Sequence, residues 1–349
     1  MTGASEPAVI FDDVCIIFGQ NPEAALPLAA AGKNRTEIQE ETGQVLGVHG
    51  CSLTVAQGEI LVLMGLSGSG KSTLLRAVNR LNPIVGGRVI VNDGNTMVDV
   101  STANAKTLRR LRSQHVAMVF QQFGLLPWRN VAENVGFGLE LAGVPKAERE
   151  AKARAELDLV GLTSWADRKV GELSGGMQQR VGLARAFATK APILLMDEPF
   201  SALDPLIRTR LQDELLDLQK NLQRTIIFVS HDLDEAFKLG DRIAIMEGGR
   251  IVQCGTPPEI ARDPADAYVA DFVAHMNPLA ALRAADVMVP GEVPADAKTV
   301  DAETKVEEIL SSLGEDQSVR VINDAGEPVG VVRAVDLVAA LSSKAKEHS

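Results

Sequence analysis

The chain of 349 residues has only three cysteines, Cys15, Cys51 and Cys254, and their spacing fits no metal-binding motif. A small, odd number of cysteines does not form a disulfide framework, so we expect small buried side chains in a reduced, cytosolic protein. Long basic runs are also missing, and the formal net charge is -11. Nucleic acid is therefore not expected as the main partner, because binding to phosphate backbones needs clustered positive charge.

No stretch approaches the roughly 18 consecutive apolar residues of a membrane-spanning helix. The amino terminus carries Glu6, Asp12 and Asp13 instead of a basic start followed by an apolar run, so we expect no signal peptide. Any link to a membrane must then come through another polypeptide. A length of 349 residues with 46% hydrophobic side chains is sufficient for two or three domains and a large core.

The most informative motif is Gly-Leu-Ser-Gly-Ser-Gly-Lys-Ser-Thr at residues 65–73, directly after the apolar run Ile60–Met64. It fits G-x-x-x-x-G-K-[ST], in which backbone N–H groups surround phosphate oxygens at the start of a helix. Lys71 would neutralise the β and γ phosphates, and Ser72 would hold Mg²⁺. A chance glycine-rich turn is the alternative, but Leu74, Leu75 and Val78 at helical spacing disfavour it. The predicted nucleotide-binding residues here are Gly65, Ser67, Gly68, Ser69, Gly70, Lys71, Ser72 and Thr73.

A second apolar run, Ile193–Met196, ends in Asp197 and Glu198. Buried parallel strands have continuous hydrophobic runs, and ligands bind at their carboxyl ends. We therefore predict that Asp197 reaches the Mg²⁺ shell and that Glu198 lies beside the attacking water. Taken alone, two acids on a turn are equally well explained as solvated surface groups.

The segment Leu-Ser-Gly-Gly-Met-Gln-Gln-Arg at residues 173–180 opens a helix. Ser174 is a plausible N-cap, while Gly175 and Gly176 expose N–H groups at the positive end of the helix dipole. The segment predicts a second phosphate-binding surface. A capped helix start without a ligand is the alternative.

These motifs resemble the ATP-binding-cassette (ABC) family, whose signature is LSGGQ; this chain has LSGGM followed by Gln178. The resemblance implies an α/β fold, a P-loop ABC-type nucleotide-binding domain with a helical subdomain at about residues 125–175. It also implies ATP and Mg²⁺ as cofactors and catalysis mainly by positioning and charge stabilisation.

Further residues follow in the family's order. Gln121 resembles the glutamine that senses the γ phosphate, holds Mg²⁺ and faces the membrane partner, with Gln122 as its rival. Asp204 resembles a loop residue that crosses a dimer interface, although it could equally be the N-cap of a helix starting at Pro205. His231 matches the switch histidine that contacts the γ phosphate, and Phe18 lies where the family stacks a ring on adenine. A core phenylalanine is the alternative for Phe18.

An unusual segment, about residues 20–47, separates Phe18 from the next strand. It resembles an insertion in the ATPase subunits of glycine betaine, proline betaine and choline importers. Three other segments, Gly65–Ser67, Leu203–Thr209 and Ser230–Ala236, also resemble that branch of the family. This resemblance implies a subunit that powers uptake of a quaternary ammonium compound at the cytoplasmic face of the bacterial inner membrane. Its implied partners are a second ATPase subunit bound head to tail, a transmembrane permease and, indirectly, an extracytoplasmic substrate-binding protein.

We expect the ATPase domain to occupy residues 1–276, and a linker with a small α+β unit to occupy residues 277–349. The order of a helix after Val306, strands Ser318–Ile322 and Val329–Val332 and a helix Val335–Leu341 resembles a single cystathionine-β-synthase (CBS) motif. Two alternatives remain open. One is a soluble cassette ATPase that acts on nucleic acid or ribosomes, and the other is a regulatory protein that senses nucleotide through its tail.

Overall fold

The computed structural model describes residues 6–274, 282–291, 297–313, 318–323, 325–335 and 337. The chain divides into two compact units, residues 1–231 with 244–254, and residues 232–243 with 255–349. This division differs from the expected ATPase domain of residues 1–276. The helices α11 (Pro257–Arg262) and α12 (Ala267–Ala274) group with the C-terminal residues instead. An ion pair between Arg262 and Asp286 contributes to that grouping.

The first unit contains a six-stranded sheet in the order β10-β9-β3-β8-β7-β6. Strand β3 is parallel to β8, β8 to β7, and β7 to β6, and every residue of β3, β7 and β8 is buried. The predicted strands are confirmed, and the carboxyl ends of β3 and β7 lie at the same edge of the sheet. The bounds are β3 (Ile60–Met64), β6 (Val116–Val119), β7 (Ile193–Asp197), β8 (Thr225–Val229), β9 (Arg242–Glu247) and β10 (Arg250–Gly255).

An antiparallel sheet in the order β2-β1-β4-β5 accompanies it. Its strands are β1 (Pro7–Phe18), β2 (Val45–Ala56), β4 (Gly86–Asn92) and β5 (Met97–Asp99). Apolar residues of both sheets, among them Phe11 and Leu63, form one core with Leu74 and Leu75 of helix α3 (Lys71–Leu75). That helix begins where the P-loop motif predicts.

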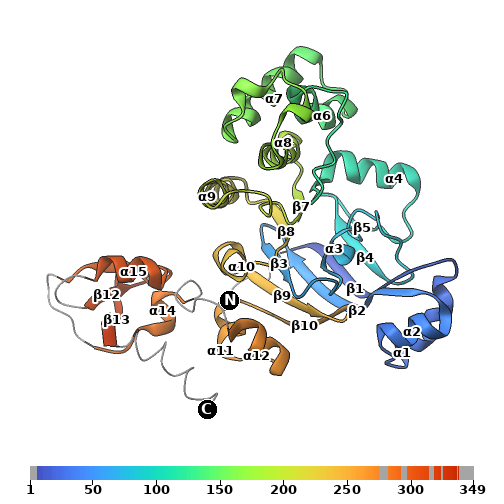
Figure 1. Cartoon of the computed structure of the whole chain (residues 1–349). Helices are drawn as coiled ribbons and strands as arrows, with labels where there is room; N and C mark the ends of the chain where they lie inside the picture. Colours follow the sequence, from blue (N-terminus) through green and yellow to red (C-terminus); the bar gives the residue numbers. More distant parts are fainter. Residues whose placement is uncertain are drawn as a thin grey trace. The chain divides into compact units, whose positions relative to one another are not determined.

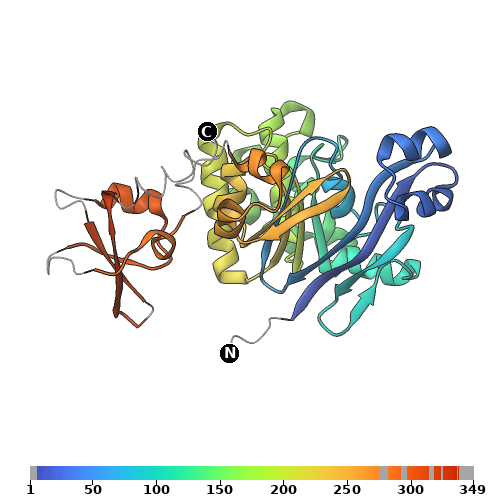
Figure 2. The same ribbon diagram turned by 90° about the horizontal axis from the view of Figure 1, so that it is seen from below.

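The segment between β1 and β2 folds into η1 (Pro22–Ala25), α1 (Leu26–Ala30) and α2 (Arg35–Thr42). Asn34 and Glu37 form a capping box that fixes the start of α2. Ile38 is fully buried against Ile17 and Leu46, so α2 is fixed beside β1 and β2 (Figure 2). The insertion is thus a small helical layer with its own core.

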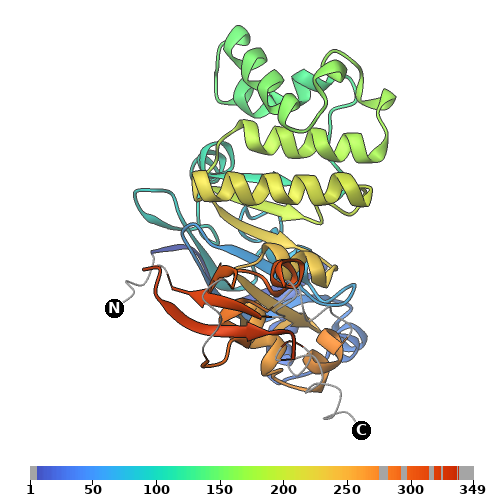
Figure 3. The same ribbon diagram turned by 90° about the vertical axis from the view of Figure 1, so that its left-hand side faces the viewer.

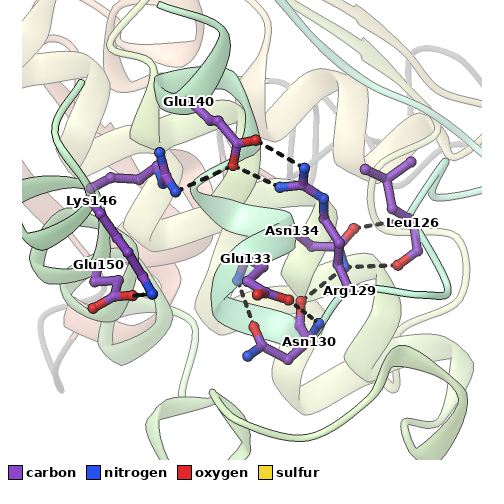
Figure 4. Close-up of polar contacts among 9 residues, drawn as sticks. Leu126, Arg129, Asn130, Glu133, Asn134, Glu140, Lys146 and Glu150 are labelled. Atoms are coloured by element: carbon purple, nitrogen blue, oxygen red, sulfur yellow. Dashed lines mark hydrogen bonds and ion pairs between the residues drawn. The ribbon is translucent and has the colours of Figure 1, made fainter. Parts of the chain in front are cut away.

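The predicted helical subdomain contains α5 (Val131–Val135), α6 (Phe137–Leu141), α7 (Lys146–Leu159), η3 (Thr163–Trp165) and η4 (Val170–Glu172). Arg129 and Glu140 pair through two hydrogen bonds, and an Asn130–Glu133 capping box begins α5 (Figure 4). Helix α8 (Gly175–Ala188) follows and runs beside α9 (Pro205–Leu222) (Figures 1 and 3).

The connection from β5 to β6 contains α4 (Ala105–Arg110) and a π-helical turn, η2 (Leu111–His115). Gly248 and Gly249 in the turn between β9 and β10 both have positive φ. Cys15 and Cys51 are buried as expected, but Cys254 is only half-buried, because β10 is an edge strand of its sheet. Among the described residues, no helix is both long and apolar enough to cross a membrane.

In the second unit, β11 (Thr299–Asp301) is parallel to β12 (Ser318–Ile322), which is antiparallel to β13 (Pro328–Arg333). Val306 and Ile309 of α15 (Val306–Ser312) pack with Val319 and Val321 of the sheet, as do residues of α14 (Ala284–Val287). The predicted strands and the first helix are confirmed, and β11 and α14 were not predicted. Most of the predicted helix 335–341 lies outside the described residues. Helix α10 (Leu233–Leu239) also belongs to this unit.

Candidate active site

A cavity of about 600 Å³ opens at the carboxyl edge of the parallel strands in the first unit. Ten of the predicted site residues line it: Phe18, Ser67, Gly68, Gly70, Lys71, Ser72, Thr73, Gln121, Glu198 and His231. Sequence reasoning missed four other lining residues, Arg35, Val45, Leu46 and Gly47, which belong to the insertion and the start of β2.

The P-loop has the conformation that its glycines permit. Gly65 has φ +138°, and a Cβ there would lie 2.1 Å from the Met246 carbonyl oxygen. Gly70 has φ +104°, and a Cβ there would lie 2.8 Å from the Gly47 carbonyl oxygen. Both positions therefore require glycine. Lys71 Nζ donates hydrogen bonds to the carbonyl oxygens of Gly65 (2.8 Å) and Leu66 (3.0 Å).

Burial lowers the pKa of the Lys71 ammonium group, and the carboxylates of Glu198 and Asp197 oppose that shift. Among the described residues, the hydrogen-bond partners of this buried ammonium group are neutral carbonyl oxygens, so a polyphosphate would give it an anionic partner at short range.

Asp197 is fully buried behind the cavity wall. Its Oδ1 accepts a hydrogen bond from Ser72 Oγ at 2.6 Å, and its Oδ2 pairs with Arg76 Nη2 at 2.8 Å. The strand end and the P-loop are thus joined directly, as the order of motifs predicts. Arg76 was not predicted; its position one helical turn after Ser72 is the only signal in the sequence.

Glu198 has φ +48°, a left-handed conformation that is strained for a residue with a side chain. Its Oε2 accepts a hydrogen bond from Gln121 Nε2 at 3.0 Å and lies 3.4 Å from His231 Nδ1. The structure therefore brings the three predicted catalytic residues together. Gln121, and not Gln122, lines the cavity.

A buried glutamine, Gln179, stabilises the backbone next to Glu198. Its Nε2 donates to the Glu198 carbonyl oxygen at 2.9 Å, and its Oε1 accepts from Ala202 N at 2.9 Å. Helix α8, which begins at the LSGGM segment, is thereby tied to the strained turn after β7. Sequence reasoning did not single out Gln179.

The remaining predicted residues do not line the cavity. Ser174 Oγ accepts from Met177 N at 3.3 Å as the N-cap of α8, and Gly175 and Gly176 open that helix. Asp204 is the N-cap of α9, where its Oδ1 accepts from Ile207 N at 3.0 Å. Gly65, Ser69 and Asp197 support the cavity from behind.

Two features define the class of protein. Glu198 and His231 lie at the edge of the P-loop cavity, and the LSGGM segment begins a helix outside that cavity. The protein is an ATP-binding cassette ATPase, which binds and hydrolyses ATP. The family model described as ABC transporter matches residues 48–201. The chain belongs to the family of ATP-binding subunits of glycine betaine, proline betaine and choline ABC transporters.

The chain is 47% identical to a glycine betaine/proline betaine transport ATP-binding protein of Salmonella typhimurium, over 93% of this chain and 80% of that protein. It is 45% identical to a glycine betaine/carnitine transport ATP-binding protein of Listeria monocytogenes, over the same shares. Among solved structures, it resembles the ATP-binding cassette MJ0796 in a dimeric post-hydrolysis state bound to ADP and Pi. That match has a TM-score of 0.60 and 27% identity, and covers 71% of this chain and 97% of the other. The names of these relatives give no support to a role on nucleic acid or ribosomes.

Proposed function

We propose that this ATPase energises uptake of a quaternary ammonium compound such as glycine betaine or choline. The observation that carries the proposal is the extent of similarity, at 45–47% identity over 93% of the chain, to subunits named for betaine transport. The chain would be peripheral at the cytoplasmic face of a bacterial inner membrane, bound to a transmembrane permease that receives solute from an extracytoplasmic binding protein.

In this proposal the cavity holds ATP with its adenine ring against Phe18 and its phosphates on the P-loop. Lys71 exchanges its carbonyl partners for the β and γ phosphate oxygens, and the backbone N–H groups of residues 67–73 surround the phosphates. Glu198 orients the attacking water, with Gln121 and His231 at the γ-phosphate end. Most of the rate enhancement comes from positioning and from charge placed around the transferred phosphoryl group.

Mg²⁺ is the proposed metal, held by Ser72 and Gln121 with Asp197 in its outer shell. The donors fit, because the Ser72 hydroxyl and the Asp197 carboxylate already converge at 2.6 Å and both are hard oxygen ligands. Among the described residues, no cluster of three or more His, Cys, Asp or Glu side chains offers a metal cage. That suits Mg²⁺, which commonly takes few protein ligands and completes its shell with phosphate and water, and which would offset phosphate charge here.

Two subunits would bind ATP head to tail. Ser174, Gly175 and Gly176 lie outside the cavity of their own chain at the N-terminus of a 14-residue helix, so they are free to meet the phosphates bound by a partner. The dimeric state of MJ0796 supports this arrangement. Asp204 would contact the partner while it caps α9.

A second hollow of about 330 Å³, also in the first unit, is the proposed docking groove for the permease. Its wall includes Phe120, next to Gln121 of the active site, and Phe137, Gly138 and Arg185 of the helical subdomain and α8. A permease helix seated there would contact Phe120. The next residue, Gln121, donates a hydrogen bond to Glu198.

The C-terminal sheet is proposed to be a single CBS-like unit that meets its twin in the dimer. Leu310 of α15 and Val329 of β13 are both at least 40% exposed and are available for such a contact. The unit would regulate transport and take no part in hydrolysis, whose residues all lie upstream.

Purification from native membranes is expected to recover the chain with a transmembrane subunit. The complex in vesicles should take up labelled betaine or choline only with ATP. A Glu198→Gln complex is the control, because it should assemble without transport. Truncation after Met276 should preserve basal hydrolysis and alter the response of uptake to salt. Recovery with ribosomes or nucleic acid instead of a permease would contradict the proposal.

A further inference from the structure

The insertion between β1 and β2 places an arginine in the wall of the active-site cavity. Arg35 is the first residue of α2, and its guanidinium donates hydrogen bonds to the carbonyl oxygens of Gly68 in the P-loop and Gly47 in β2. The segment that contributes it is outside the motifs from which the site was predicted.

The guanidinium lies where three segments of the first unit meet. A Cβ on Gly70 would lie 3.4 Å from Arg35 Nη2, and one on Gly249, in the β9–β10 turn, would lie 2.9 Å from it. That turn also contacts the P-loop, because Gly249 N donates to the Ser69 carbonyl oxygen at 3.0 Å. Glycines therefore make the space that the arginine occupies.

No described carboxylate forms an ion pair with this cation, which bonds only to neutral carbonyl oxygens. Its Nε is buried without a hydrogen-bond partner among the described residues. Burial also lowers the pKa of the guanidinium. A half-buried cation with spare donors is costly without an anion, and phosphate is the anion that guanidinium groups bind best.

The position of Arg35 is fixed by its own element. The Asn34–Glu37 capping box holds the first turn of α2, and Ile38 is buried between Ile17 and Leu46, the neighbours of Phe18 and Gly47. A side chain supported in this way is pre-organised for a ligand.

We propose that Arg35 is a nucleotide-binding residue whose guanidinium contacts the phosphate chain of the nucleotide, making the insertion part of the ATP site. Lys71 and Arg35 then approach the phosphates from two walls of one cavity. The proposal extends the binding site of the established ATPase and does not depend on the transported solute.

Calorimetry on the full chain with Mg²⁺ tests it, using adenosine, ADP and the non-hydrolysable analogue AMP-PNP. R35Q, which keeps hydrogen-bond donors but removes the charge, should weaken binding of ADP and AMP-PNP by about ten- to a hundredfold, the range for a lost charged hydrogen bond. Adenosine binding should be unchanged. R35K should recover part of the affinity that R35Q loses, because it keeps the charge but not the planar fork of donors.

The matched control is K33Q in the same segment, since Lys33 pairs with Glu41 and does not line the cavity. It should bind all three ligands like wild type. Wild-type affinity in R35Q would overturn the proposal. Equal losses in R35Q and R35K would also overturn it, because Arg35 would then act only as a clamp on two carbonyls. If R35Q does not fold, R35M keeps the apolar stem and carries the same expected losses.

Discussion

At the scale of single residues, the proposed active site contains one acid with a strained backbone. Glu198 has φ +48°, and its carbonyl oxygen is bonded by Gln179 Nε2 and, at 3.0 Å, by Ser201 Oγ. Strain of this kind persists only where the surroundings over-determine it, and here the side chain lies beside Gln121 Nε2 and His231 Nδ1 in the cavity wall. We therefore expect the proposed role of Glu198 in hydrolysis to be separable from nucleotide binding by the P-loop.

Glu198→Gln should leave ATP binding intact and slow hydrolysis by about a hundredfold or more, the usual range for loss of a general base. ATP-bound dimers should then accumulate, visible by gel filtration with ATP. Glu247→Gln is the control, because Glu247 is an exposed acid at the β9–β10 turn, outside the cavity. Unchanged turnover in the Glu198 variant would refute its role as the base.

At the scale of elements, buried polar groups fix turns that the hydrophobic pattern leaves open. Asp93 after β4 is buried and accepts from Asn95 N at 3.0 Å and Thr96 N at 2.8 Å, and it pairs with Arg110 of α4. These bonds lower the pKa of Asp93 to about 2, with the Thr96 amide as the largest cause. The ionised carboxylate thus stabilises the β4–β5 connection and joins it to α4.

Asp93→Asn should lower the free energy of unfolding at pH 7 by about 1–2 kcal/mol. The pKa of Asp93 is lower in the folded protein than its value near 4 in the unfolded chain. The stability that it contributes is therefore fully present above pH 4 and is lost as the pH falls toward 2. The difference from wild type should therefore shrink over that window in urea titrations. Asp167→Asn, at the exposed Arg154–Asp167 pair, is the control, with an expected change under about 0.5 kcal/mol. A deficit in the Asp93 variant that is the same at pH 7 and pH 2 would contradict this account.

At the scale of the whole molecule, the two segments predicted to bind phosphate lie apart in one chain. The P-loop half lies inside the cavity, whereas the LSGGM half begins α8 outside it. Such a separation makes sense if each half meets the other half on a second chain.

Lys71→Ala should weaken nucleotide binding by the isolated subunit, because a cation is removed from the phosphates. Ser174→Arg should spare binding but prevent dimerisation and turnover, because a bulky cation then stands where the partner's nucleotide would enter. Calorimetry and gel filtration separate the two effects. Mixing the two inactive variants should restore at most one composite site. Loss of ATP binding by Ser174→Arg monomers would disprove the head-to-tail arrangement.

Much of the site could be predicted because its chemistry is local in sequence. The residues from Gly65 to Thr73 form a phosphate loop wherever a buried strand precedes them, and Asp197 and Glu198 follow a run that only a central strand would have. The carboxyl ends of parallel strands share one edge, so these motifs had to meet. The N-caps Ser174 and Asp204 were also predictable, because capping involves neighbours along the chain.

The tertiary structure alone decided which distant groups complete the cavity. Arg35 reaches Gly68 and Gly47 because α2 packs its Ile38 against β1 and β2. Gln179 reaches the Glu198 carbonyl because α8 packs against β6, the neighbour of β7 in the sheet. No hydrophobic period or motif marks Arg35 or Gln179, because each contact joins segments that are far apart in the sequence and meet only in the folded chain. The sequence by itself thus determined the phosphate chemistry, and the packing of the insertion and of α8 determined what surrounds it.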